Sequence, residues 1–257
     1  MPPASYNVKN EALVETIGLD AGYGGTVALS DVNFSAAAGQ RIALLGPNGG
    51  GKTTLIRTLS GELKAIEGSV NLASETGTVP QHDPARDGWP ATAADVVICG
   101  TLDSIPWWRR PGRRQRKLAS EALAAVGLAD HSTTTYGELS GGQKRRVQVA
   151  SALAGGARIL LLDEPFAGLD AVASRRLEDL IERLAQNGST ILIATHDLEQ
   201  ARSWERVLCL NGEQIAFGEP NSVLTRTNLE LTFGSDLIEV PGGGLMAPPH
   251  HHEDHEH

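Results

Sequence analysis

Residues 46–53 of this chain, Gly-Pro-Asn-Gly-Gly-Gly-Lys-Thr, restrict its fold more than any other segment. They follow a short apolar run at residues 41–45 and lead into a run with helical spacing at residues 53–59. In such a loop, glycines let backbone N–H groups approach phosphates, the lysine reaches the β- and γ-phosphate oxygens, and the threonine hydroxyl ligates Mg²⁺. The sequence therefore predicts a strand, a phosphate-binding loop and a helix whose N-terminus points at the anion. The nucleotide-binding residues predicted here are Gly46, Pro47, Asn48, Gly49, Gly50, Gly51, Lys52, Thr53 and Thr54.

A second glycine-rich segment consists of Leu139, Ser140, Gly141, Gly142 and Gln143. Residues 142–153 follow it with a helical pattern, which places the segment at a helix N-terminus. Backbone N–H groups, the helix dipole and a serine hydroxyl make a second anion-binding geometry there, this time without a lysine. The chain therefore carries two different phosphate-binding motifs.

Acidic and imidazole side chains follow the buried strands that the sequence predicts. The apolar runs at residues 159–162 and 190–194 are separated by a helical stretch at residues 172–186, which predicts a parallel sheet with right-handed crossovers. Ligands bind beyond the carboxyl ends of such strands. Asp163 is expected to hold Mg²⁺ through its water shell and Glu164 to orient and deprotonate the attacking water, and His196 follows the second run.

The remaining patterns predict a fold of the α/β class with parts of different character. Residues 13–19 and 27–36 indicate an antiparallel pair around a glycine-rich loop, and residues 207–210 and 214–217 indicate a closing hairpin. Helical patterns replace strand patterns between residues 85 and 155. We therefore divide the chain into residues 1–84 with the antiparallel strands and the phosphate loop, 85–155 as a helical subdomain, 156–240 as the remainder of the core, and 241–257 as a flexible tail.

Composition narrows the function classes. The 257 residues contain no apolar run near the ~18 residues that would span a bilayer, and the N-terminus lacks the succession typical of a secretory signal. A net charge of -9 argues against a nucleic-acid partner, because polyphosphate backbones are met with excess Lys and Arg. Cys99 and Cys209 lack metal-ligand spacing, and a reducing cytoplasm is the expected compartment.

Together the two glycine-rich motifs and the acidic strand end resemble the ATP-binding-cassette (ABC) ATPases, from about residue 16 to about residue 218. The resemblance implies a P-loop NTPase core with a parallel sheet, an N-terminal antiparallel part and a helical subdomain. It also implies a head-to-tail homodimer, in which each ATP lies between the phosphate loop of one copy and residues 139–143 of the other. Gly50 departs from the commoner serine or alanine of that loop, without removing a group that the chemistry requires.

The resemblance assigns roles to four further residues. Gln81 is expected to touch Mg²⁺ and water while its loop reports the nucleotide state to a membrane subunit, and His196 is expected to contact the γ-phosphate. Tyr23 offers a ring on which adenine could stack, although it is also compatible with a half-buried loop aromatic. Asp170 matches a dimer-contact aspartate and is equally suited to cap a helix.

The chain also resembles the ATPase subunits of zinc and manganese ABC importers. That likeness rests on the phosphate loop, the Trp-Trp-Arg-Arg-Pro insert at residues 107–111 and the acidic histidine tail. It implies separate membrane permease subunits, an extracytoplasmic substrate-binding protein and a peripheral place on the cytoplasmic face of the cell membrane. The alternatives are an importer for another substrate, a soluble ABC ATPase acting on DNA or ribosomes, and a non-catalytic metal-binding protein.

The tail combines imidazole with carboxylate groups, which suit Zn²⁺ and Mn²⁺. We interpret it as a metal buffer or sensor instead of a transport site; a purification tag is the alternative. Its histidines are His250, His251, His252, His255 and His257.

A cluster of basic residues lies in the predicted helical subdomain. Most such runs are solvated faces, and the functional alternative is contact with acidic lipid headgroups or with an acidic permease loop. Its members are Arg109, Arg110, Arg113, Arg114, Arg116 and Lys117.

Overall fold

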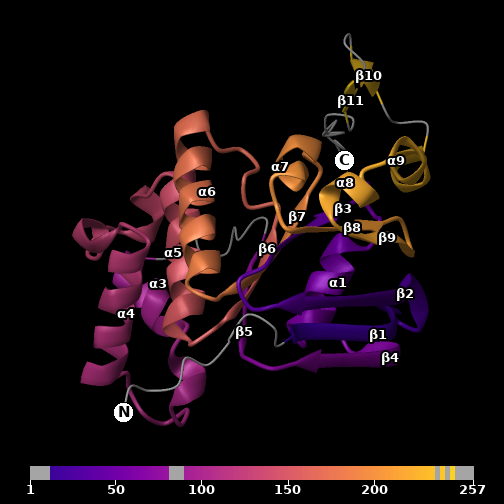
Figure 1. Ribbon diagram of the computed structural model, residues 1–257. Helices are drawn as coiled ribbons and strands as arrows, with labels where there is room; N and C mark the ends of the chain where they lie inside the picture. Colours follow the sequence, from indigo (N-terminus) through magenta and orange to yellow (C-terminus); the bar gives the residue numbers. More distant parts are fainter. Residues whose placement is uncertain (1–11, 81–89, 235–237, 241–243, 247–257) are drawn as a thin grey trace, which may run out of the picture.

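The computed structural model describes residues 12–80, 90–234, 238–240 and 244–246. Its larger sheet has six strands in the order β5-β6-β7-β3-β8-β9 (Figure 1). The first five run parallel, and β9 closes the edge antiparallel to β8. Their bounds are β3 Arg41–Leu45, β5 Thr76–Val79, β6 Ile159–Asp163, β7 Thr190–Thr195, β8 Arg206–Leu210 and β9 Gln214–Gly218. The predicted parallel sheet and closing hairpin are confirmed.

Both faces of this sheet are covered, because alternate residues of its strands enter two separate cores. In β3, Ile42 and Leu44 point into one core, whereas Ala43 and Leu45 point into the other. The first core lies under helix α1 (Lys52–Leu59) and the antiparallel sheet. The second is covered by α6 (Ala171–Gln186), α7 (Leu198–Arg202) and the helices of residues 93–154. Because both faces are buried, successive residues of the inner strands are mostly apolar, which accounts for the continuous apolar runs in the sequence.

A second, three-stranded antiparallel sheet has the order β2-β1-β4. Strands β1 (Ala12–Tyr23) and β2 (Thr26–Ala37) form the predicted pair and turn at residues 24–25. The third strand, β4 (Ala65–Leu72), was not predicted. Its side chains are almost all exposed, so it lacks the alternating apolar pattern by which a half-buried strand is recognised.

Three helices pack on one another beside the sheet: α3 (Ala93–Cys99), α4 (Arg113–Ala125) and α5 (Gly141–Ala154). Short 3-10 turns join them at η2 Leu102–Ser104, η3 Ala129–His131 and η4 Tyr136–Glu138. Only α5 among the three makes extensive contact with strand β5. The helical group is thereby attached to the edge of the sheet (Figure 1).

One part of the predicted flexible tail is a strand instead. Short helices α8 (Pro220–Val223) and α9 (Arg226–Phe233) precede a two-stranded ribbon of β10 (Ile238–Val240) and β11 (Gly244–Met246). The prediction of a flexible tail from residue 241 gave weight to the Gly and Pro residues there as flexible residues.

Candidate functional site

The carboxyl ends of three neighbouring strands bring the predicted site residues to one edge of the sheet. Leu45, the last residue of β3 before the glycine-rich loop, is paired with Thr195 of β7. Asp163, the last residue of β6, is paired with Ala194 of the same strand. The glycine-rich loop follows Leu45, Glu164 follows Asp163, and His196 follows Thr195. Residues far apart in the sequence are therefore neighbours because the strands are parallel and in register.

The glycine-rich loop fits between its strand and helix only because of its glycines. A Cβ atom on Gly46 would lie 2.1 Å from the carbonyl oxygen of Leu210, at the end of strand β8. Gly49 and Gly51 have φ angles of 75° and 97°, in the left-handed region that L-residues rarely adopt. Helix α1 begins at the next residue, Lys52, so its N-terminal N–H groups face the loop.

Lys52 is buried inside the loop that it follows, with 6% of its surface exposed. Its ammonium donates hydrogen bonds to the carbonyl oxygens of Gly46 at 2.7 Å and Pro47 at 2.9 Å. Burial lowers the pKa of this ammonium below its usual value, and the nearby carboxylates of Glu164 and Asp163 oppose that shift. The cation is thus held in the concave side of the loop, where a phosphate oxygen could replace the carbonyl partners.

Thr53 and Asp163, the two residues predicted to ligate Mg²⁺, are in direct contact. The Thr53 hydroxyl donates to Asp163 Oδ2 at 2.8 Å, and Asp163 is 8% exposed. Burial raises the pKa of the Asp163 carboxyl, the Thr53 hydrogen bond opposes this, and the charge of Glu164 adds to it. A divalent cation between these oxygens would offset the cost of burying that charge. A hydroxyl beside a carboxylate fits Mg²⁺, which prefers oxygen ligands and keeps several waters.

Glu164 has the backbone conformation of a constrained site residue. It is buried, and its φ angle of 44° is rare for a residue with a side chain. Its N–H donates to the carbonyl oxygen of Ala194 at 3.1 Å, which ties the end of β6 to β7. Strain of this kind persists where the surrounding structure fixes the residue, and it is concentrated at functional sites.

Glu164 and His196 line one cleft of about 440 Å³, together with Thr195 and Asp197. The Thr195 hydroxyl accepts a hydrogen bond from the Asp197 N–H at 3.0 Å, which shapes the turn that carries His196. Glu164 and His196 therefore border a common space at the carboxyl ends of β6 and β7. This is the arrangement in which one group could act on water while the other contacts a phosphate.

Tyr23 lies at the end of β1 and is 45% exposed. Its hydroxyl oxygen accepts from Arg57 Nη1 at 3.4 Å, and Arg57 belongs to helix α1. The ring is thus held near the helix that follows the glycine-rich loop while a large part of it stays open. This partial exposure is compatible both with stacking on adenine and with a half-buried loop aromatic, the two alternatives that the sequence left open.

The second glycine-rich segment is the N-terminus of helix α5. Ser140 caps the helix: its Oγ accepts from the Gln143 N–H at 3.3 Å, and its own N–H donates to Gln143 Oε1 at 2.9 Å. A Cβ on Gly142 would lie 2.7 Å from Cβ of Ala173 in α6, so this glycine is also needed for helix packing. The Leu139 side chain is buried in the core. A Cβ on Gly141, by contrast, would make only an ordinary contact, with Leu169 Cδ2 at 3.6 Å.

The two anion-binding ends belong to different parts of the molecule. Helix α1 contacts β1, β2 and β6, whereas α5 contacts α3, α4, α6 and β5. The two helix ends that the sequence predicts to bind anions therefore belong to different groups of elements among the described residues.

Asp170 is the N-cap of helix α6. Its Oδ1 accepts from the N–H groups of Val172 at 2.9 Å and Ala173 at 2.7 Å. The structural use that the sequence suggested for this residue is therefore present. Asp170 is also exposed, so its remaining surface is open to a second molecule.

Two sets of predicted residues lie outside the described part of the chain: Gln81 and the histidines of the tail, His250, His251, His252, His255 and His257. Beside Gln81, the carbonyl oxygen of Pro80 accepts a hydrogen bond from the Arg145 guanidinium of helix α5. Sequence reasoning missed Arg145, because nothing in a helical pattern shows that its side chain reaches another element. Within the described residues, no three His, Cys, Asp or Glu side chains gather as a metal ion would require.

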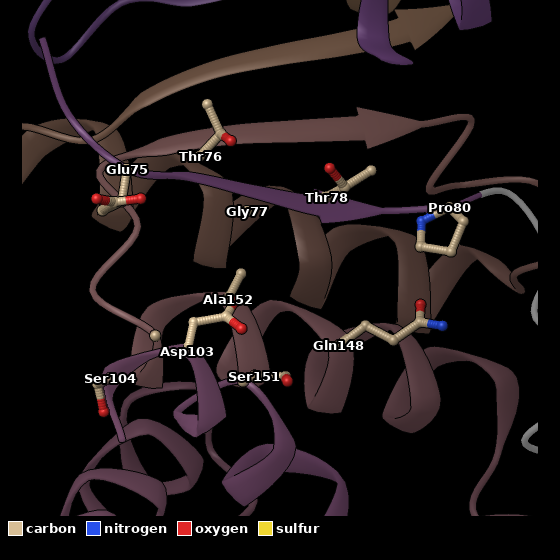
Figure 2. Close-up of a pocket in the computed structure, with 12 residues that line it drawn as sticks. Glu75, Thr76, Gly77, Thr78, Pro80, Asp103, Ser104, Gln148, Ser151 and Ala152 are labelled. Carbon is tan, nitrogen blue, oxygen red and sulfur yellow. The ribbon is translucent and has the colours of Figure 1, made fainter. Parts of the chain in front are cut away.

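A further cleft, of about 380 Å³, is bordered by strand β5, helix α5 and the segment that follows α3 (Figure 2). Thr76 and Thr78 of β5 form one wall, and Gln148 and Ser151 of α5 form the other. Its lining continues to Pro80, directly before Gln81. The cleft therefore adjoins the segment from which the sequence predicts a signal to a partner.

No helix among the described residues has the length and apolar character needed to cross a membrane.

Comparisons with known proteins agree with this geometry. The sequence model of the ABC transporter family matches residues 29–167. The manganese transport system ATP-binding protein MntB of Bacillus subtilis (strain 168) is 34% identical over 233 residues, which cover 87% of this chain and 93% of MntB. The zinc transport system ATP-binding protein TroB of Treponema pallidum (strain Nichols) is 35% identical over 218 residues, 81% of this chain and 82% of TroB. A solved structure of a metal-chelate type ABC transporter in an inward-facing conformation has a TM-score of 0.81 at 28% identity, covering 89% of this chain and 91% of that one.

Proposed function

This chain belongs to the ABC transporter family, and we propose that it is the ATP-hydrolysing subunit of an importer for a divalent metal ion, manganese or zinc. The observation that carries the ATPase function is the meeting of Lys52, the Thr53–Asp163 pair and Glu164 at the carboxyl ends of β3 and β6. The choice of metal is supported by the similarity to MntB and TroB over most of the chain.

Each residue of the site has a distinct task in our proposal. Lys52 and the loop N–H groups bind the phosphates, and Thr53 with Asp163 holds Mg²⁺, which neutralises charge on the phosphate oxygens. Glu164 orients a water molecule and accepts its proton, while His196 contacts the γ-phosphate. Gln81 completes the surroundings of this water, and Tyr23 stacks on the adenine ring.

We further propose a head-to-tail homodimer that completes two sites. The N-terminus of α5, with Ser140, Gly141 and Gly142, contacts the nucleotide held by the other copy, and Asp170 contributes to the contact between copies. The separate positions of the two anion-binding ends support this, because either end alone leaves one side of a triphosphate in water. ATP then favours the closed dimer, and hydrolysis removes contacts that hold it closed.

The partners in this proposal are membrane permease subunits and an extracytoplasmic substrate-binding protein. The permease docks in the cleft between β5 and α5, because that cleft adjoins the Gln81 segment and lies between the core and the helical group. The chain then works at the cytoplasmic face of the membrane. Residues 85–155 form the permease-facing helical part, and residues 1–84 with 156–240 form the catalytic core.

Metal uptake tests the proposal directly. Cells that lack this chain are expected to lose uptake of manganese or zinc, and the intact gene should restore it, whereas a Glu164→Gln gene should not. Uptake of each metal is measured separately by isotope, with a Glu230→Gln gene as the control because that carboxylate pairs only on the surface, with Arg226. Unchanged uptake of both metals in the deletion strain would rule out this transport function and leave an importer for another substrate.

The histidine tail is proposed as a buffer or sensor for Zn²⁺ or Mn²⁺, on its composition alone. Removal of residues 250–257 is expected to weaken metal binding by the purified chain and to change how uptake responds to external metal. ATP hydrolysis by the purified chain should be unaffected. If the shortened chain keeps both its metal affinity and its uptake response, the tail has neither function.

A further inference from the structure

We propose that the surface formed by residues 107–117, which we call the Trp-Arg surface, binds anionic lipid headgroups. It joins η2 to α4 and includes the first turn of α4. Six of its residues are Arg or Lys and none is Asp or Glu, although the whole chain has a net charge of -9. The charge of this surface is thus opposite to that of the chain and complementary to an anionic membrane.

Two tryptophans project from the tip of a turn at the start of this surface. The Arg109 N–H donates to the Pro106 carbonyl oxygen at 2.8 Å, so Trp107 and Trp108 are the two central residues of the turn. They are 91% and 70% exposed, and their rings touch only edge to face, with centroids 5.8 Å apart. Tryptophan with one apolar face and an N–H group is the residue type enriched where a membrane meets water.

The arginine side chains of this surface make no polar contact with the described part of the chain that would stabilise the fold. The side chains of Arg109, Arg110, Arg113, Arg114 and Arg116 are exposed and have no ion pair or hydrogen bond with any described residue. Helix α4 begins at Arg113 and has no acidic residue in its first turn. Positive charge at a helix N-terminus opposes the helix dipole, so this arrangement costs the isolated chain free energy that a bound anion would offset.

The surface also follows closely on residues that line the cleft between β5 and α5. The turn begins two residues after Ser104, which lines the cleft between β5 and α5 together with Asp103 and Gly100. This step rests on the proposed function, in which that cleft receives the permease. A tryptophan turn beside the docked permease would face the headgroups that surround it, and its arginines would pair with their phosphates.

Vesicle binding by the purified full-length chain tests the inference. We expect it to cosediment with vesicles of phosphatidylcholine and phosphatidylglycerol in equal parts at about 0.1 M salt, and to be released at about 1 M salt, where the Debye length is only ~3 Å. Vesicles of phosphatidylcholine alone should leave it in solution. Tryptophan emission should shift to the blue with the mixed vesicles, because the indole rings leave water.

Two double variants and a matched control define the surface. Arg109→Gln with Arg110→Gln should weaken binding about twenty-five-fold, since each basic residue at an anionic surface contributes about five-fold. Trp107→Ala with Trp108→Ala should weaken it about ten-fold and remove the spectral shift. Lys64→Gln with Arg226→Gln removes the same charge elsewhere and should change little. ATP hydrolysis by the purified chain should be equal in all four proteins, because none of these residues lies in the nucleotide site.

Several results would overturn the inference. Equal binding to both kinds of vesicle, no binding at all, or an equal loss in the control variant would each do so. If the parent chain does not bind the mixed vesicles and the tryptophan variant no longer copurifies with the permease, the surface binds protein instead of lipid. Vesicle binding needs neither metal nor ATP turnover, so its failure is distinguishable from failure of the proposed transport function.

Discussion

Glu164→Gln is expected to lower the rate of ATP hydrolysis by about 10²–10⁴-fold, the usual contribution of a general base. The amide has nearly the same shape as the carboxylate but cannot take a proton from water. In the proposed site, Lys52, Thr53 and the loop bind the nucleotide, and none of them is changed. We therefore expect ATP to bind normally and to remain uncleaved.

The uncleaved nucleotide should then make the proposed dimer visible. With ATP and Mg²⁺ present, the Glu164→Gln chain is expected to elute as a dimer in size-exclusion chromatography with light scattering, whereas ADP should leave it monomeric. Phosphate release measures turnover in parallel. The substitution should leave the fold intact, because it keeps the volume of the side chain and the hydrogen bond from the backbone N–H of residue 164 to the Ala194 carbonyl oxygen.

Glu230→Gln is the matched control, since Glu230 makes a surface pair with Arg226 on α9 at 2.7 Å. Its turnover should equal that of the parent chain. Hydrolysis by Glu164→Gln at the parent rate would show that another group takes the proton. Absence of any ATP-induced dimer, even with the permease present, would remove the basis for a site shared between two copies.

The sequence predicted those elements that carry strong periodic patterns. The apolar run at residues 41–45 is strand β3 with the same bounds, and the helical stretch at residues 172–186 is α6 with one further residue at its start. Strand β4 was missed because its exposed side chains have no apolar alternation. Periodicity reports burial, so an element that buries little is not detected by it.

The site was predictable as a set of residues but not as a set of contacts. The motifs predicted Thr53 and Asp163 as ligands of one Mg²⁺ ion, and the structure places them in contact. Spacing did not indicate that Lys52 would turn back to the carbonyl groups of its own loop, or that Gly142 packs against Ala173. Such contacts depend on side-chain direction and on how closely two helices approach, which sequence spacing does not specify.

Gly46→Ala is expected to damage both stability and nucleotide binding. The added Cβ would lie 2.1 Å from the Leu210 carbonyl oxygen, a backbone atom of strand β8 that cannot rotate away. Overpacking against backbone should cost about 3 kcal/mol in the free energy of unfolding. Moving the loop away from β8 would also displace the Lys52 ammonium, so we expect weaker binding of ATP. Urea denaturation measures the first effect and calorimetric titration with ATP the second.

Gly50→Ala is the control for that prediction because its Cβ would meet the same Leu210 oxygen at 3.0 Å instead of 2.1 Å, with Cδ and the carbonyl oxygen of Pro47 also at 3.0 Å. A shift of a few tenths of an ångström relieves these contacts, and alanine also restricts the unfolded chain, which contributes about 0.4–1 kcal/mol to stability. We expect the free energy of unfolding of Gly50→Ala to lie within about 1 kcal/mol of the parent value. Its affinity for ATP should be similar to that of the parent. If the two variants behave alike, the close approach of β8 is not what requires glycine at position 46, and the cause lies in how the loop itself meets the phosphates.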